Sequence, residues 1–143
     1  MDAVIDADDE RACQRLCTAY VHLIDACEFR AFANLFTPEG VLELPARHLK
    51  GREEIFEVLS QRPPSVVSLH FCTSTRIEIL DKNHARGSTY AMIFRHDGTN
   101  GSAALPLPME QPLSAGIYDD EFLRTDEGWR FQSRRMRAFF RKK

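Results

Sequence analysis

Three ionisable side chains lie where predicted helices and strands begin or end, and each could take part in proton transfer. Asp25 ends a predicted helix, His70 begins a predicted strand, and His96 ends the next strand. A carboxylate beneath a sheet can accept a hydrogen bond from Nδ1–H of a strand histidine, which leaves Nε2 free to take a proton. We therefore predict that Asp25 and His70 form an acid–base pair, about 2.6–3.2 Å apart.

Other interpretations of these residues stay open. Asp25 and Glu28 have capping-box spacing, in which Asp25 would begin a second helix. His70 could be an ordinary histidine near a sheet edge, and His96 an exposed loop residue. A metal triad of Asp25, His70 and His96 has suitable side chains, but the spacing gives it no support, so we predict no metal. No Gly-x-Ser-x-Gly motif, Cys–His signature or phosphate-binding glycine loop occurs in the sequence.

The segment "SLHFCTSTRIEILD" alternates as a half-buried strand does. His70 shares one side with Cys72 and Ser74, which are small enough to leave room for a ligand. The same side continues into Arg76 and Glu78, which belong in water. We therefore expect the strand to leave the pocket, or to bulge and change faces, after Ser74.

The wider pattern places helices first and long strands afterwards, an α+β order. We predict helices over 8–26, 26–36 and 51–62. We predict strands over 41–45, 66–80, 84–96, 114–124 and 129–140. The 16-residue loop 97–112 is longer than a usual hairpin loop, so we expect a lid that borders a pocket. The chain reads as a single domain over 1–143.

Composition excludes several classes of protein. Hydrophobic residues make up 43% and charged residues 28% of the 143 residues, as in an ordinary globular protein. The net charge of −2 argues against nucleic acid as a partner. The chain nevertheless ends in the basic segment "RRMRAFFRKK", for which we favour a solvated terminal strand and tail over a patch that binds an anion. No apolar run approaches the roughly 20 residues of a membrane span, so we expect no membrane association. The four cysteines form no Cys-x-x-Cys pair, which favours a reducing cytoplasm.

Four segments resemble the SnoaL-like branch of the nuclear-transport-factor-2-like (NTF2-like) superfamily, nearest the scytalone dehydratase group. They are "YVHLIDACEFRAFANLFTPEGVLE", "KGREEIFEVL", "LHFCTSTRIEIL" and "GIYDDEFLRTDEGWRFQSRRMR". The resemblance implies a cone: a strongly curved antiparallel sheet packed on about three N-terminal helices and enclosing a pocket. It also implies an Asp–His dyad, which falls on Asp25 and His70. His96 matches a second pocket histidine only if its hairpin holds one extra residue, and a tyrosine of the dehydratase is Ile24 here.

This resemblance implies a cofactor-independent lyase or isomerase of the dehydratase type, acting on a small cyclic or aromatic molecule. We favour an enzyme; the alternatives are a polyketide cyclase, or a non-catalytic ligand-binding or structural subunit such as the small subunit of a ring-hydroxylating dioxygenase. We also expect a homo-oligomer, a trimer or dimer, because late strands carry unpartnered apolar residues. These are Ile117, Leu123, Met136, Phe139 and Phe140. The residues expected to bind substrate are Tyr20, Ile24, Cys72, Ser74, Tyr90, His96 and Tyr118.

Overall fold

The structure, a computed structural model, describes residues 3–98 and 104–143. Its helices are α1 (Ala3–Asp25), α2 (Phe29–Ala33) and α3 (Arg52–Leu59). Its strands are β1 (Phe36–Leu44), β2 (Arg47–Lys50), β3 (Val67–Ile79), β4 (His84–His96), β5 (Ser114–Thr125) and β6 (Gly128–Arg141). Within the described ranges, none of the helices has the length and apolar character needed to cross a bilayer.

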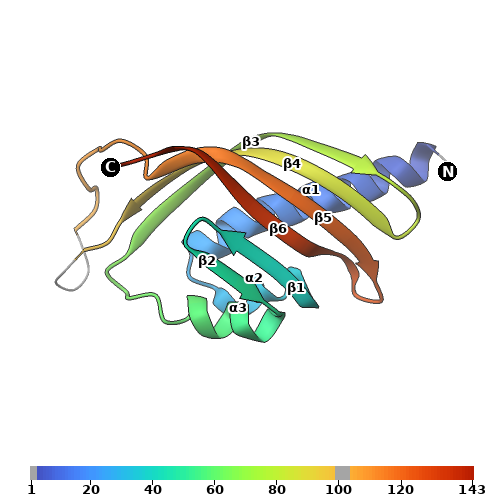
Figure 1. The fold of residues 1–143 in the computed structure, drawn as a ribbon, viewed down its shortest axis with the longest axis horizontal. Coiled ribbons are helices and arrows are strands. Elements are labelled where there is room, and N and C mark those ends of the chain that lie inside the picture. The colour runs from blue at the N-terminus through green and yellow to red at the C-terminus, as the bar shows by residue number, and fades with distance from the viewer. Residues whose placement is uncertain (1–2, 99–103) are drawn as a thin grey trace.

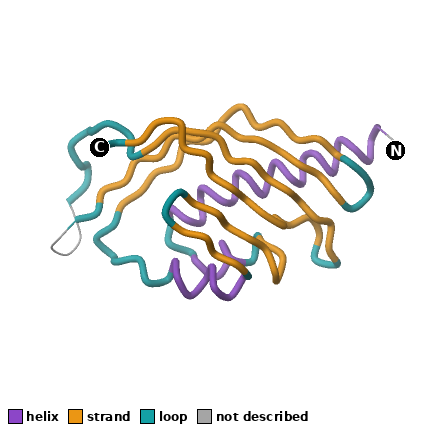
Figure 2. Tube along the Cα trace, in the orientation of Figure 1, coloured by secondary structure: helices purple, strands orange, loops and turns teal. Residues whose placement is uncertain are grey.

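One mixed sheet dominates the fold, with the strand order β2-β1-β6-β5-β4-β3. The four long strands β3 to β6 curve over α1, while β1, β2, α2 and α3 gather at the other edge (Figure 1). The tube in Figure 2 shows the same two groups, with α1 lying against the inner face of the curved strands. This arrangement is the predicted α+β cone.

The core forms where the apolar stripe of α1 meets the inner face of the sheet. Cys13, Leu16, Cys17, Tyr20 and Ile24 are all buried, at the spacings of three and four predicted from the sequence. They belong to one buried cluster with aromatic side chains of the late strands, Tyr118, Phe122, Trp129 and Phe131. The sheet is therefore anchored on the helix that ends at Asp25.

Some element boundaries differ from the prediction. The strand predicted over 41–45 begins earlier, at Phe36, and a short partner strand, β2, follows it. The second helix is confined to Phe29–Ala33. β1 runs parallel to β6, whereas the other neighbouring strands are antiparallel. This pairing joins segments almost a hundred residues apart, so local periodicity carries no sign of it.

β3 contains the bulge that the sequence suggested. Its pairing with β4 shifts between Thr73 and Arg76, and Ser74 has a φ of 56°. Before the bulge Ser68, His70 and Cys72 are the less exposed residues of the strand; after it Thr75, Ile77 and Ile79 are. The prediction that the strand bulges and changes faces is confirmed. The prediction that Ser74 faces the pocket is wrong, because the bulge exposes it.

The outer face of the sheet carries an apolar surface, which we call the outer patch. It consists of Leu69, Phe71, Tyr90, Met92, Phe139 and Phe140, each between 38% and 75% exposed. Phe139 and Phe140 were predicted to be exposed. Met136 is buried, so its prediction was wrong, because it points to the inner face opposite Tyr118. Ile117 and Leu123 are half-buried.

Candidate active site

Asp25 and His70 meet where the end of α1 lies against the start of β3. Oδ1 of Asp25 is 2.6 Å from Nδ1 of His70, within the predicted range, and accepts a hydrogen bond of 2.8 Å from the Ser68 hydroxyl. Oδ2 accepts the main-chain N–H of His70, also at 2.8 Å. The capping-box alternative is wrong: Glu28 is the N-cap of α2, and this cap has no side-chain hydrogen bond. The carboxylate of Asp25 instead accepts hydrogen bonds from residues of β3.

These hydrogen bonds determine the charge and the tautomer of the pair. Burial opposes the negative charge of Asp25, but hydrogen bonds from the His70 ring, the His70 main chain and Ser68 outweigh burial and lower the pKa of Asp25. An ionised carboxylate only accepts hydrogen bonds, so Nδ1 of His70 carries a hydrogen. In the neutral ring Nε2 then holds a free lone pair. Among the described residues, no hydrogen-bond partner of Nε2 is found.

His70 lines a cavity of about 580 Å³ between α1, α3 and the sheet, a size typical of a small-molecule site. Its inner wall is largely apolar, and includes Ile24, Phe32, Leu42, Leu59, Ile93 and Met136. Ser68 also reaches the cavity from beside the dyad. A base with a free lone pair therefore faces an apolar pocket.

Two tyrosines lie beside the dyad in the same cavity. The ring of Tyr20 packs edge-on against His70, with centroids 6.3 Å apart, and against Tyr118, with centroids 5.3 Å apart. Burial raises the pKa of both phenols. Their hydroxyls therefore keep their protons, and the two hydroxyls also interact with each other.

A buried arginine lies against these tyrosines. The Arg134 guanidinium is 4.2 Å from the ring centre of Tyr20 and 3.9 Å from that of Tyr118, so it makes a cation–π contact with each of the two rings. Nε and Nη2 of Arg134 donate to the carboxylate of Asp120 at 2.8 and 3.3 Å, and both side chains are fully buried. Burial disfavours the charge on Arg134, but Asp120 compensates and raises the pKa of the guanidinium. The result is a buried Arg134–Asp120 ion pair whose guanidinium lies against the two phenol rings.

The structure brings only part of the predicted substrate-binding set to the cavity. Tyr20, Ile24 and Tyr118 line it, and Ser74, exposed by its bulge, does not. Cys72 is half-buried against the core outside the lining, and burial raises the pKa of its thiol.

Tyr90 and His96 also lie outside the cavity. Tyr90 pairs with Thr73 and is 55% exposed on the outer face, because its neighbour Ala91 takes the buried position. His96 pairs with Val67 at the exposed end of β4. The residue opposite His70 is Ile93, which lines the cavity. The proposed metal triad is not formed, and within the described part of the chain no three His, Cys, Asp or Glu side chains gather in a way that could hold a metal ion.

The predicted lid is described only in part, because residues 99–103 lie outside the described residues. Asp97, the first residue of the loop, and Leu113, which follows the loop, line the cavity. The Ser65 hydroxyl donates to the main-chain oxygen of Gly98 at 3.0 Å. The described ends of the loop thus border the pocket, and closure stays a prediction.

Sequence reasoning missed three residues of the site. Ser68 and Arg62 line the cavity, and Arg134 packs against its two tyrosines. Ser68 precedes His70 by two positions, so strand alternation could have placed it beside the dyad. Arg134 looked like one charge in a basic C-terminal strand, and only its pairing with Asp120 across β5 and β6 shows why it is buried. Arg62 follows α3 in a segment without periodicity.

Comparison with known proteins identifies the family and the fold. Residues 6–135 match the model of the SnoaL-like domain family, while no curated protein sequence matches the chain significantly. Similar structures include a protein from Novosphingobium aromaticivorans named as a candidate scytalone dehydratase (TM-score 0.82, 16% identity, 99% of this chain and 91% of that one). An NTF2-like protein with a cystatin-like fold from the same organism has a TM-score of 0.73 at 17% identity, covering 93% of this chain and 83% of that one.

A protein of unknown function from Mycobacterium tuberculosis is also similar, with a TM-score of 0.76 and 24% identity over 96% of this chain and 76% of that one. These identities are low, so the structures support the fold and not a reaction. The family model, in contrast, spans most of the sequence. The chain therefore belongs to the SnoaL-like domain family and has an NTF2-like fold.

Proposed function

We propose that the protein is a cofactor-independent lyase or isomerase acting on a small cyclic or aromatic molecule. The observation that carries the proposal is the 2.6 Å hydrogen bond between Asp25 and Nδ1 of His70 at the wall of an apolar cavity. The bond occupies Nδ1, so Nε2 is the ring nitrogen left free to act as a base, and His70 lines the cavity. Membership of the SnoaL-like domain family is compatible with this proposal.

In this mechanism Nε2 of His70 removes a proton from carbon, commonly one α to a carbonyl group. The imidazolium that forms is stabilised by the Asp25 carboxylate, which is already oriented by Ser68 and by the His70 main chain. The Tyr20 or Tyr118 hydroxyl donates to the carbonyl oxygen, where negative charge develops. Arg134, held by Asp120, packs against both phenol rings and keeps them in place.

The second half of the reaction decides between a lyase and an isomerase. If the adjacent carbon carries a hydroxyl group, the enolate expels it, the imidazolium of His70 supplies the proton, and water leaves. If it does not, His70 returns the proton to another carbon, and the double bond moves. General acid–base catalysis typically contributes about 10²–10⁴-fold, so the rest must come from positioning in the apolar pocket.

Proton exchange tests this proposal without knowledge of the natural substrate. A panel of cyclic and aromatic ketones, with and without a β-hydroxyl group, is incubated with the protein in D₂O. NMR follows loss of the α-proton signal, and mass spectrometry distinguishes dehydration from isomerisation. We expect exchange with the wild type, and a rate about 10²–10⁴-fold lower in His70→Ala.

The matched control is His96→Ala, which removes an exposed histidine outside the cavity and should leave exchange unchanged. Equal exchange by wild type and His70→Ala would refute the assigned base. A panel in which no ketone exchanges would count against enolisation chemistry. The reducing cytoplasm stays the expected location, and a homo-oligomer the expected assembly.

A further inference from the structure

The cavity that holds the dyad is also lined by four arginines from four separate segments. Arg47 begins β2, Arg62 follows α3, Arg95 lies near the end of β4, and Arg141 ends β6. Asp97 is the one acidic side chain in the lining as described. Even when Asp25 is added, positive charges exceed negative ones by two, in a chain whose net charge is −2. The positive charge is concentrated at the site.

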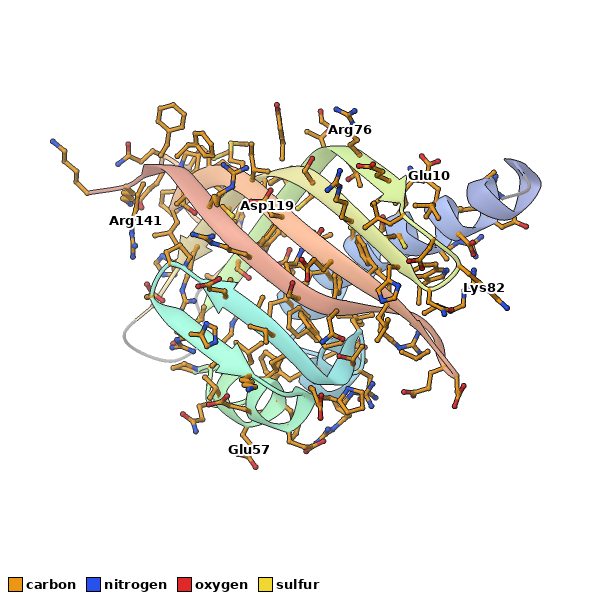
Figure 3. The ribbon with its side chains drawn as sticks, turned by 45° about the vertical axis from the view of Figure 1, so that its right-hand side comes forward. Glu10, Glu57, Arg76, Lys82, Asp119 and Arg141 are labelled. Carbon is orange, nitrogen blue, oxygen red and sulfur yellow. The ribbon has the colours of Figure 1, made fainter. Side chains whose placement is uncertain are left out.

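These arginines lie at the mouth of the cavity. Arg47, Arg95 and Arg141 are exposed, whereas Tyr20, Phe32, Leu42 and Tyr118 at the inner wall are buried. In Figure 3, Arg141 is seen at the end of β6, the end of the sheet where β3 begins and β4 finishes. The cavity therefore runs from an entrance lined by Arg47, Arg62, Arg95 and Arg141, which we call the arginine entrance, to an apolar inner wall near His70.

Most of this positive charge is not neutralised within the protein. Arg95 pairs with Asp97 at 2.8 Å. For Arg47, Arg62 and Arg141, no carboxylate lies within 4.0 Å in the part of the chain that the structure describes. A cluster of uncompensated arginines around an apolar cavity raises the local concentration of anions and can bind a planar anion through two parallel hydrogen bonds.

Hydrogen bonds to the main chain fix the side chain of Arg62 at the cavity. Its Nη1 donates to the main-chain oxygen of Ile24 at 3.3 Å, and its Nη2 donates to that of Val66 at 3.2 Å. The Nε–H is buried and has no hydrogen-bond partner among the described residues. A guanidinium has five donors, so donors remain beyond those that hold it in place. The contact with the main-chain oxygen of Ile24 places Arg62 beside the residue that precedes Asp25.

From this geometry we infer that the substrate is an amphipathic acid: an apolar ring that reaches His70 and a carboxylate, or another planar anion, that binds the arginine entrance. The location of the reacting end beside His70 rests on the proposed function. The preference for an anion rests only on the arginines and the cavity. A neutral molecule of the same shape should bind less tightly, because it leaves the arginines without a partner.

The test compares 2-naphthoate with 2-naphthamide, which share a ring system and differ in charge. Isothermal titration calorimetry measures both dissociation constants, and the ring signals of His70 in NMR spectra locate the ligand. We expect 2-naphthoate to bind about tenfold more tightly than the amide, as a few solvent-exposed charge pairs allow. Raising the salt concentration from about 20 mM to about 500 mM should weaken only the naphthoate.

Arg47→Gln/Arg141→Gln should reduce the preference for naphthoate to about twofold, because it removes two exposed charges and disturbs no described ion pair. Arg76→Gln is the matched control: Arg76 is an exposed arginine on β3, outside the cavity lining and away from Arg141 (Figure 3). The inference is wrong if the two ligands bind equally or not at all, if the double variant keeps the full preference, or if the His70 signals do not shift.

Two further results separate this inference from the proposed function. His70→Ala should keep the preference for naphthoate, because the imidazole takes no part in binding the anion. If that preference holds but no ketone exchanges its α-proton, the proposed reaction fails and the anion site stands. If neutral ketones exchange rapidly and naphthoate has no advantage, the anion site fails and the reaction stands.

Discussion

Replacing Asp25 by asparagine should invert the tautomer of His70. An asparagine side chain fits the same space but has one acceptor oxygen and one NH₂ group. If its oxygen occupies the Oδ2 position, it still accepts the main-chain N–H of His70. The NH₂ group then lies at the Oδ1 position, where it can donate to the Ser68 hydroxyl and to Nδ1 of His70. Nδ1 must then be an acceptor, and the ring hydrogen moves to Nε2.

The magnitudes follow from the three hydrogen bonds that Asp25 accepts. All three are charge-assisted in the wild type and neutral in Asp25→Asn. The difference between charged and neutral hydrogen bonds predicts a loss of about 1–3 kcal/mol in the free energy of unfolding, which urea denaturation measures. Because Nε2 loses its lone pair, proton abstraction should fall about 10²–10⁴-fold.

The tautomer can be read directly from the ring ¹⁵N chemical shifts, in a two-bond ¹H–¹⁵N spectrum recorded at a pH where the ring is neutral. The His70→Ala spectrum identifies the His70 signals among the five histidines. We expect a hydrogen on Nδ1 in the wild type and on Nε2 in Asp25→Asn. An Nδ1–H tautomer in both proteins would refute the reasoning, and so would full activity with the hydrogen on Nε2.

Three other outcomes are expected. Folding lowers the pKa of Asp25, so this residue stabilises the folded state above the ordinary value of 3.8, and the stabilisation is lost as the pH falls through the lower folded value. The difference in free energy of unfolding between wild type and Asp25→Asn should therefore shrink in acid. A difference that stays constant with pH contradicts this. Burial raises the pKa of the Cys17 thiol to about 11, whereas Cys27 is exposed. A thiol reagent at about pH 8 should therefore label Cys27 rapidly in the wild type, and Cys27→Ser should show no rapidly labelled thiol. The outer patch should make the protein self-associate, and Phe71→Glu should weaken that association in sedimentation velocity. A wild-type protein that stays monomeric at micromolar concentration would refute this expectation.

The parts of the fold that local patterns determine were predictable from the sequence. The apolar stripe of α1 and the long strands β3 to β6 follow their periodicities closely. The charged residues Arg76 and Glu78 required a change of face in β3, and the bulge at Ser74 supplies it. What remained hidden depends on residues far apart in the sequence, such as the parallel pairing of β1 with β6 and the burial of Arg134 on Asp120.

The candidate site divides in the same way. Asp25 and His70 could be proposed from their positions at the ends of a helix and a strand, together with the family resemblance. Tyr90 could not be assigned to a face, because β4 has too many apolar residues on both sides for alternation to decide. The arginine entrance was suggested only in part: Arg141 lies in the basic C-terminal segment, whereas Arg47, Arg62 and Arg95 come from three other segments, and each looks like an ordinary surface charge alone.

A double-mutant cycle on ketone α-proton exchange tests the central claim, that Asp25 and His70 act as one catalytic unit. Exchange rates are measured for wild type, Asp25→Asn, His70→Ala and the double variant, each checked for folding by circular dichroism. Residues that act as a unit have strongly non-additive effects, so the double variant should exchange about as slowly as His70→Ala alone. A double variant slower by the product of the two single losses would show that Asp25 and His70 act independently, and would contradict the dyad.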